Sequence, residues 1–207
     1  LFDNEQDQLD LETRILGFDM TRLLDTPAVR TPAMMYLFHR LEQRLDGTPA
    51  IFVVDEGWKA LDDPVFVRRI KDWEKTIRKR NGLVGFCTQS ASDALDSRIA
   101  AAIIEQAATQ IFFPNPRARP AEYIDGFGLS EHEFSLVRTL PDTSRCFLVK
   151  RGDHSVVARL DLSGLSGPLK VLAGTERSVR RLDQLRAEVG DAPSAWLGPF
   201  MAGRTAP

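Results

Sequence analysis

Two adjacent carboxylates are the residues of this chain most able to do chemistry. Asp55 and Glu56 directly follow the apolar run Ile51-Phe-Val-Val54. A strand that is apolar at every position is typical of the centre of a parallel sheet, where both faces are covered. Because ligands in open α/β sheets bind outside the carboxyl ends of the strands, we expect both carboxylates to lie at a ligand crevice. There, one carboxylate can hold Mg²⁺ through its water shell, and the other can orient or deprotonate an attacking water.

A polar turn, Thr88-Gln-Ser90, follows the next apolar run, residues 83–87. In a parallel sheet this turn lies at the same edge as the two carboxylates. The uncharged amide of Gln89 can donate to a phosphate oxygen and accept from a water. These side chains together are typical of a nucleoside-triphosphate hydrolase, with residues 51–56 as its Walker B strand. The alternative is an apolar strand that ends in an acidic turn, followed by an ordinary polar loop.

Hydrophobic periodicity predicts the elements that would position these side chains. Apolar runs bounded by turn residues predict strands at 13–19, 51–54, 83–87 and 109–113. Apolar residues at helical spacing predict helices that begin at Thr31, at Asp63-Pro64 and near Arg98. The alternation and the short turns favour an α/β fold with a mainly parallel sheet flanked by helices.

After Pro116 the pattern changes. Two short helices are predicted near 121–127 and 130–140, followed by strands at 144–150 and 155–160 that form a hairpin antiparallel to the main sheet. A charged helix at about 176–189 and a short segment with Trp196 and Phe200 complete the chain. We therefore predict a main domain over 1–162 and a small helical extension over 163–207.

Composition limits the function classes. The 207 residues are 43% hydrophobic and 27% charged, with a net charge of −2, which gives no electrostatic reason to expect direct nucleic-acid binding. No apolar stretch reaches the roughly 20 residues of a transmembrane segment. Cys87 and Cys146 lie in apolar runs, which predicts buried thiols in a reducing compartment. Since the first residue is not Met, we expect the chain to begin within a longer protein.

The helix predicted after Pro64 is strongly basic. Its cations are Arg68, Arg69, Lys71, Lys75, Arg78, Lys79 and Arg80, against only Asp72 and Glu74. They could line an interface with another subunit, an acidic partner or nucleic acid. A solvated face opposite an apolar one explains the same pattern, and no aromatic residues alternate with the cations to stack on bases.

An ordered series of short motifs extends over nearly the whole chain. The motifs are Gly17-Phe-Asp-Met20, Tyr36-Leu-Phe-His-Arg40, Val54-Asp-Glu-Gly-Trp-Lys59, Ile77-Arg-Lys-Arg80, Thr88-Gln-Ser90, Phe113-Pro-Asn-Pro116, Phe127-Gly-Leu129, Ser144-Arg-Cys-Phe-Leu-Val-Lys150 and Trp196. In order and spacing they resemble the C-terminal part of the large ATPase of bacterial type IV secretion and conjugation machines (the TrbE/CagE type). The resemblance implies a RecA-like P-loop ATPase domain that uses ATP and Mg²⁺ and assembles with itself into hexamers. It also implies a cytoplasmic location, peripheral at the inner membrane, where the ATPase works with other secretion components to energise pilus assembly and substrate export.

The resemblance also implies roles for single residues. Asp55 would be the Walker B carboxylate that holds Mg-ATP through water, Glu56 the catalytic carboxylate and Gln89 the sensor of the γ-phosphate. Arg145 and Lys150 lie at the two ends of a predicted strand whose family counterpart faces the nucleotide or a neighbouring subunit.

Four basic residues are candidates for contacting the nucleotide. Arg145 is the candidate for an arginine that acts in trans, and Arg117 and Arg119 are its rivals. Lys150 and Arg117 are further candidates for binding the nucleotide itself. The alternative for each arginine is a surface residue paired with a carboxylate, which contributes under about 1 kcal/mol.

The phosphate-binding half of such a site is not in this sequence. No G-x-x-x-x-G-K-[S/T] motif occurs, and the family places it before the first strand predicted here. The chain alone is therefore expected neither to bind ATP tightly nor to hydrolyse it. Two alternative functions stay open: a non-hydrolysing assembly or docking module of the secretion machine, and a DNA-pumping coupling ATPase with the same core.

Overall fold

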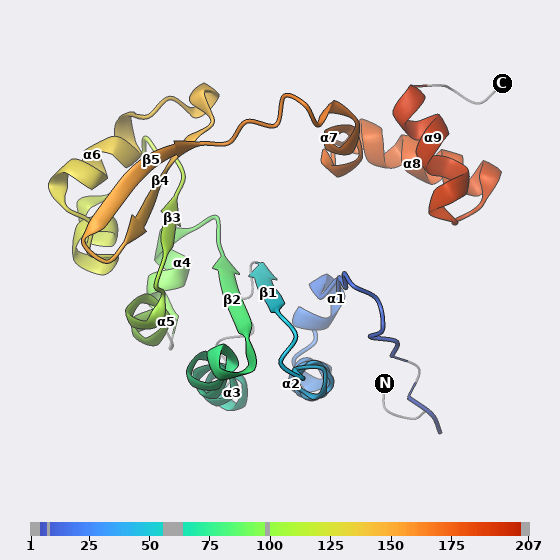
Figure 1. Cartoon of the computed structure of the whole chain (residues 1–207), viewed down its shortest axis with the longest axis horizontal. Helices are drawn as coiled ribbons and strands as arrows, with labels where there is room; N and C mark the ends of the chain where they lie inside the picture. The colour runs from blue at the N-terminus through green and yellow to red at the C-terminus, as the bar shows by residue number, and fades with distance from the viewer. Residues whose placement is uncertain (1–4, 8, 56–63, 98–99, 204–207) are drawn as a thin grey trace. The chain divides into compact units, whose positions relative to one another are not determined.

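The computed structural model describes residues 5–7, 9–55, 64–97 and 100–203 (Figure 1). The chain divides into two compact units, Leu1–Ala158 and Arg159–Pro207, which are described separately. The sequence predicted a domain boundary after residue 162, and this boundary stays a prediction. Glu56 lies outside the described residues, and so does Arg98, near which a helix was predicted.

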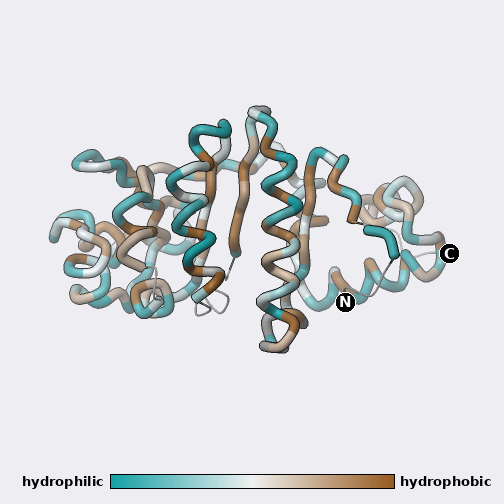
Figure 2. Tube along the Cα trace, turned by 90° about the horizontal axis from the view of Figure 1, so that it is seen from below, coloured by the Kyte–Doolittle hydropathy of each residue, from teal (hydrophilic) through white to brown (hydrophobic). Residues whose placement is uncertain are grey.

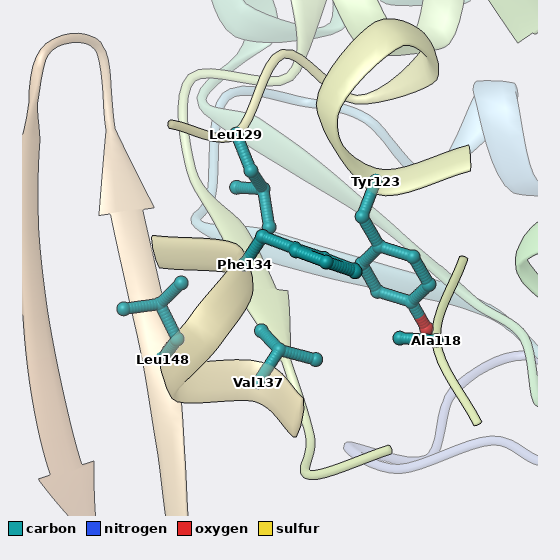
Figure 3. Packing of buried hydrophobic residues seen from close by; sticks show 6 residues of the cluster. All are labelled: Ala118, Tyr123, Leu129, Phe134, Val137 and Leu148. Atoms are coloured by element: carbon teal, nitrogen blue, oxygen red, sulfur yellow. The ribbon is translucent and has the colours of Figure 1, made fainter. Parts of the chain in front are cut away.

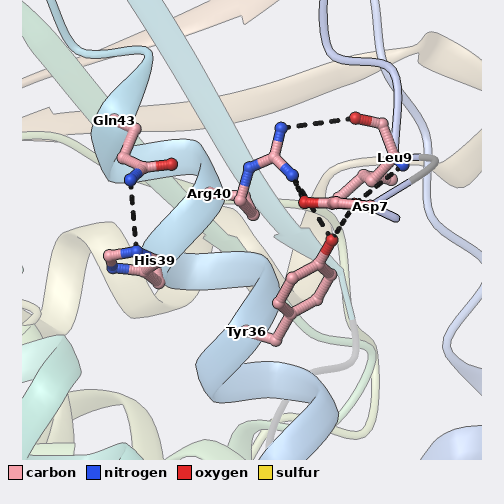
Figure 4. Close-up of polar contacts among 6 residues, drawn as sticks. All are labelled: Asp7, Leu9, Tyr36, His39, Arg40 and Gln43. Carbon is pink, nitrogen blue, oxygen red and sulfur yellow. Dashed lines mark hydrogen bonds and ion pairs between the residues drawn. The ribbon is translucent and has the colours of Figure 1, made fainter. Parts of the chain in front are cut away.

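The first unit begins with an irregular segment that polar contacts attach to the helix α2. α1 is the single turn Thr21–Leu24, and α2 is Pro27–Gln43. Arg40 of α2 forms an ion pair with Asp7 and donates to the carbonyl of Leu9 at 3.4 Å, and Tyr36 donates to Asp7 (Figure 4). The motif Tyr36-Leu-Phe-His-Arg40 therefore binds the preceding segment to α2.

Two expectations for this region are wrong. Residues 13–19 form no strand, and Ile15 is exposed, because no neighbouring strand offers hydrogen bonds to this segment among the described residues. α2 begins at Pro27 and not near Thr31, and Pro32 lies inside the helix. The dipeptide Thr-Pro occurs at both 26–27 and 31–32. Each is a plausible helix start, since proline fits the first turn.

A parallel pair of strands follows, as predicted. β1 is Ala50–Asp55 and β2 is Gly82–Cys87, and the register places Asp55 opposite Cys87. Between them lie α3, Pro64–Thr76, and the 3₁₀ turn η2, Ile77–Arg80. One face of the pair packs on α2 and α3 around a cluster composed of Met34, Phe38, Ile70, Trp73 and Ile77.

The opposite face of this pair is not covered by the described residues, contrary to the prediction of a strand buried on both sides. Ile51 is 74% exposed, Val53 64% and Leu83 57%. Figure 2 colours the Cα trace by hydropathy, with hydrophobic stretches in brown. Cys87 is likewise exposed and Cys146 half-buried, so the prediction of buried thiols is wrong, and the two form no disulfide. Cys87 alternates with Leu83 along β2, which places it on the uncovered face.

A second, antiparallel sheet has the strand order β3-β4-β5. Its strands are Gln110–Phe112, Cys146–Arg151 and His154–Arg159. The strand predicted at 109–113 thus forms, but it pairs antiparallel with β4 instead of joining the parallel pair. An apolar run does not encode its partner, which depends on contacts that are distant in sequence.

Short helices precede and cover this sheet. They are α4 Ala91–Asp96, α5 Ala100–Gln106, the π-helical turn η3 Ala121–Gly126, α6 Glu131–Thr139 and the 3₁₀ turn η4 Asp142–Ser144. Figure 3 shows the cluster that η3, α6 and the loops beside them form with β4, composed of Ala118, Tyr123, Leu129, Phe134, Val137 and Leu148. The helices predicted near 121–127 and 130–140 are confirmed.

The second unit is helical. It contains α7 Ser166–Leu172, α8 Glu176–Val189 and α9 Pro193–Ala202, with the predicted helix at 176–189 confirmed. Arg181 of α8 lies over the ring of Phe200 at 5.6 Å and donates to the carbonyl of Pro199 at 3.3 Å. These contacts and the buried Leu185 join α8 to α9. None of the helices that the structure describes is long and apolar enough to cross a membrane.

Candidate functional site

The carboxyl ends of β1 and β2 bring the first candidate residues to one edge. Asp55 is the last residue of β1 and is exposed. It lies opposite Cys87, and Gln89 follows two residues later on the same edge. The predicted placement of Asp55 and Gln89 at the carboxyl ends of two paired parallel strands is therefore confirmed, while their roles stay predictions. Glu56 directly follows Asp55 in sequence, and its geometry lies outside the described residues.

The backbone around Gln89 is fixed by the two hydroxyl residues beside it. The Thr88 hydroxyl donates to the carbonyl of Ser90 and accepts from its N–H, each at 3.1 Å. The Ser90 hydroxyl caps α4 by accepting from the N–H of Asp93 at 3.2 Å. The motif Thr88-Gln-Ser90 is thus a turn braced by hydrogen bonds, and its central residue, Gln89, is exposed. These hydrogen bonds fix the backbone of the turn from which the Gln89 side chain projects.

Arg145 lies on a turn immediately before β4. It ends η4 with φ 55° and ψ 23°, in the left-handed region, and it is exposed. The sequence predicted a strand from 144, but β4 begins at Cys146, because the preceding residues form the 3₁₀ turn. Among the described residues Asp55 has no hydrogen bond or ion pair with Arg145, Arg117 or Lys150.

Lys150 has a partner within the fold. Its ammonium group lies 2.7 Å from the Glu133 carboxylate, with both side chains largely buried. Burial alone would raise the pKa of Glu133. Hydrogen bonds from Lys150, the Ser130 backbone and the Ser155 hydroxyl, together with the charge of Lys150, outweigh it and lower this pKa to about 2. The proposed contact of Lys150 with a nucleotide would require this ammonium to leave Glu133.

Glu133 is the residue that sequence reasoning missed. It is the one buried charged residue in the described part of the chain, 5% exposed. It completes a capping box with Ser130 at the start of α6 and also binds Lys150 of β4. The sequence Ser130-x-x-Glu133 is a recognisable capping-box signature, and it could have identified the helix start, although not the ion pair.

Arg117 follows a loop organised by Asn115. The N–H of Asn115 donates to the carbonyl of Val137 at 2.8 Å, and its side-chain amide donates to the Tyr123 hydroxyl at 3.1 Å. Its side-chain oxygen accepts from the N–H of Arg117 at 3.0 Å, and the Arg117 side chain is exposed. Arg119, the other rival, forms an ion pair with Glu122 at 2.5 Å. The motif Phe113-Pro-Asn-Pro116 therefore has a structural role in this loop.

The basic helix has the two faces that its sequence predicted. Ile70, Trp73 and Ile77 are buried, and Arg68, Lys75, Arg78, Lys79 and Arg80 are exposed. Arg69 differs from the others, since it forms an ion pair with Glu42 of α2. Within the described residues, no group of three or more His, Cys, Asp or Glu side chains could hold a metal ion. A single exposed carboxylate such as Asp55 fits Mg²⁺, which keeps several waters and takes one or two carboxylates from a protein.

Comparison with known proteins gives a consistent set of relatives. VirB4 of the type IV secretion system of Bartonella henselae is 47% identical over 201 residues, which are 97% of this chain and 26% of that protein. VirB4 of Brucella abortus is 45% identical over the whole chain and 25% of its own length. PtlC of Bordetella pertussis, also a type IV secretion system protein, is 44% identical over 97% of this chain and 24% of its own length. The chain therefore spans about a quarter of the length of these relatives.

A solved structure and a family profile agree with these relatives. The structure of VirB4 of Thermoanaerobacter pseudethanolicus matches with a TM-score of 0.52 and 21% identity, over 62% of this chain and 35% of that one, and so supports a shared mixed α/β fold. The family described as TraG P-loop domain matches residues 1–143. The resemblance to the large ATPases of type IV secretion is thus confirmed, and the chain belongs to the TraG P-loop domain family, with VirB4-type proteins as its relatives.

Proposed function

We propose that this chain is the Walker B-bearing part of the ATPase motor of a bacterial type IV secretion system. The longer protein would hydrolyse ATP to energise pilus assembly and substrate export. The observation that carries this proposal is the sheet edge at which Asp55 and the braced Gln89 turn lie side by side on parallel strands. This is the position at which α/β folds bind their ligands, and the chain belongs to a P-loop family.

In this proposal each residue of the edge has one task. Asp55 holds Mg²⁺ through water, Glu56 orients and deprotonates the attacking water, and Gln89 contacts the γ-phosphate. Bound Mg²⁺ would neutralise charge that develops on the phosphate oxygens. The phosphates would be held by a P-loop elsewhere in the longer protein, which would complete a RecA-like site.

The basic residues would complete the site across a subunit interface. Arg145 is proposed to reach the nucleotide of a neighbouring copy in a homo-hexamer, because its guanidinium group is exposed on a fixed turn. Arg117 and Lys150 are weaker candidates for nucleotide contacts, Lys150 because Glu133 already holds it. We further propose a cytoplasmic location, peripheral at the inner membrane, with other secretion components as partners and no direct binding of nucleic acid.

The test of this function is Glu56→Gln in the longer protein that carries a P-loop. Loss of the catalytic carboxylate should lower ATP turnover by about 10²-fold or more, while nucleotide binding, measured by fluorescence titration, should be unchanged. Glu188→Gln removes an exposed carboxylate from α8 and is the matched control. Turnover by Glu56→Gln at the level of this control would contradict a motor role.

The same variant separates the motor from its main alternative. An assembly or docking module is favoured by the exposed cations of α3 and η2, which offer a surface for an acidic partner. If Glu56→Gln leaves export of substrates intact in cells, the docking function is supported and the motor function fails. The purified chain of 207 residues, which has no P-loop, should show no turnover above background.

A further inference from the structure

Arg145 adopts a backbone conformation that its residue type does not favour. Only Asn81 and Arg145 have positive φ among the non-glycine residues that the structure describes, at 59° and 55°. Asparagine is tolerated in the left-handed region because its short side chain can bond locally, and Asn81 donates to the carbonyl of Gly47 at 3.2 Å. A long side chain has no such compensation. The turn alone therefore does not explain an arginine at 145.

Ser144 binds the backbone on both sides of Arg145. Its hydroxyl donates to the carbonyl of Pro141 at 2.6 Å and accepts from the N–H of Cys146 at 3.1 Å. Its own N–H donates to the same carbonyl of Pro141 at 2.9 Å. One hydroxyl group thus joins the start of η4 to the first residue of β4 and holds the intervening residue in place.

The strand that continues from this turn is firmly anchored. Leu148 of β4 is completely buried, and Lys150 is bound to Glu133 of α6. Among the described residues the Arg145 guanidinium has no ion pair, although its backbone is fixed at both ends. Backbone strain of this kind concentrates at functional sites, where the surrounding structure holds it in place.

We propose that Ser144 is a positioning residue that holds the strained turn so that Arg145 can reach the nucleotide of a neighbouring copy. The inference rests on the proposed function, in which Arg145 acts across a subunit interface. It adds the reason for the strain: the turn is retained because it directs the guanidinium group outward.

A double-mutant cycle in the longer protein tests this role. Ser144→Ala should lower the kcat of ATP hydrolysis about tenfold or more with little change in KM, because the positioning of one charged group is lost. Arg145→Ala should lower kcat at least as much. In the Arg145→Ala background, Ser144→Ala should cause no further loss, since its effect passes through Arg145. Ser144→Thr keeps a hydroxyl group and should restore most of the kcat.

Controls separate positioning from folding. Ser135→Ala removes an exposed hydroxyl from α6 of the same unit and should leave kcat unchanged. Arg145→Gly removes the strain, since glycine adopts positive φ without steric cost. It should leave the melting temperature of the 207-residue chain no lower, and it should abolish the contribution of Arg145 to turnover in the longer protein.

The outcomes distinguish this inference from the proposed function. Losses in kcat that add in the double variant, or full turnover by Arg145→Gly or Arg145→Ala, would overturn the positioning role. If Glu56→Gln is inactive while Ser144→Ala behaves as Ser135→Ala does, the motor function stands and only the inference fails. If Glu56→Gln turns over normally, the proposed function itself fails.

Discussion

The two sheets of the first unit differ in how deeply the fold buries their strand residues. The parallel pair β1–β2 packs on α2 and α3 with one face, and Ile51 and Val53 on the other face are exposed in the part of the chain that the structure describes. In the antiparallel sheet, Leu148 of β4 is completely buried, as is Val137 of the adjoining α6. Ile111 and Val156 of the second sheet are also exposed, so each sheet packs with one face, but the second contains a completely buried strand residue and the described strands of the first contain none.

The two regions also differ in where their candidate site residues lie. Asp55 alternates with Ile51 and Val53 along β1, so the candidate magnesium carboxylate lies on the uncovered face. Arg145 lies on a turn that is braced by Ser144 and anchored by the buried strand behind it. In the proposed function, the first region would therefore contribute an exposed carboxylate to the site, and the second a side chain on a braced turn.

The largest expected effect on stability comes from truncating a completely buried side chain of the antiparallel sheet. Leu148→Ala should lower the free energy of unfolding by about 3 kcal/mol, because a completely buried leucine leaves a cavity when it is truncated. Urea denaturation of the 207-residue chain measures this. The control is Leu83→Ala on the exposed face of β2, which should cost much less. Equal losses at the two sites would mean that the two sheets are covered alike.

A smaller, pH-dependent effect is expected at Glu133. Its pKa is lowered from 4.5 to about 2 in the folded chain, so its contribution to stability is present above pH 4.5 and is lost as the pH falls toward 2. Glu133→Gln should lower the free energy of unfolding by about 2 kcal/mol at pH 7, since a charged hydrogen bond to Lys150 is lost. The difference from the native chain should shrink as the pH approaches 2.

The control for this pH dependence lies on the same helix. Glu131 is exposed in the first turn of α6, and Glu131→Gln should change stability little at any pH. Denaturation curves for the three proteins between pH 2 and pH 7 would show the effect. A gap between the native chain and Glu133→Gln that stays constant down to pH 2 would contradict a charge-dependent role of this pair.

Local signals in the sequence predicted the elements that depend on them. α8 was predicted at its observed position, where the structure shows Thr175 capping its start and Gly190 following its end. The edge that carries Asp55 and Gln89 was predicted because parallel strands place their carboxyl ends together. The helix depends on the residues at its own ends, and the shared edge follows once β1 and β2 pair in parallel.

The remaining features depend on contacts between distant residues. Whether β3 pairs with β2 or with β4 depends on contacts that no short window contains. The ion pair between Glu133 and Lys150 joins residues 17 positions apart. The left-handed conformation of Arg145 contradicts the local preference of arginine, so no propensity could have predicted it. Sequence reasoning thus identified the candidate arginine but not the turn that holds it.

The smallest expected effect tests the uncovered face directly. Val53→Thr places a hydroxyl group on β1 without changing the shape of the side chain, and it should alter the free energy of unfolding of the 207-residue chain by no more than about 0.5 kcal/mol. The same exchange at Val137, which is completely buried, should cost about 2 kcal/mol, because the hydroxyl group loses its water. Val53→Thr should also reduce self-association, measured by sedimentation velocity, since it interrupts an exposed apolar surface. If Val53→Thr costs as much as Val137→Thr, other residues of the chain cover this face, and the contrast between the two sheets disappears.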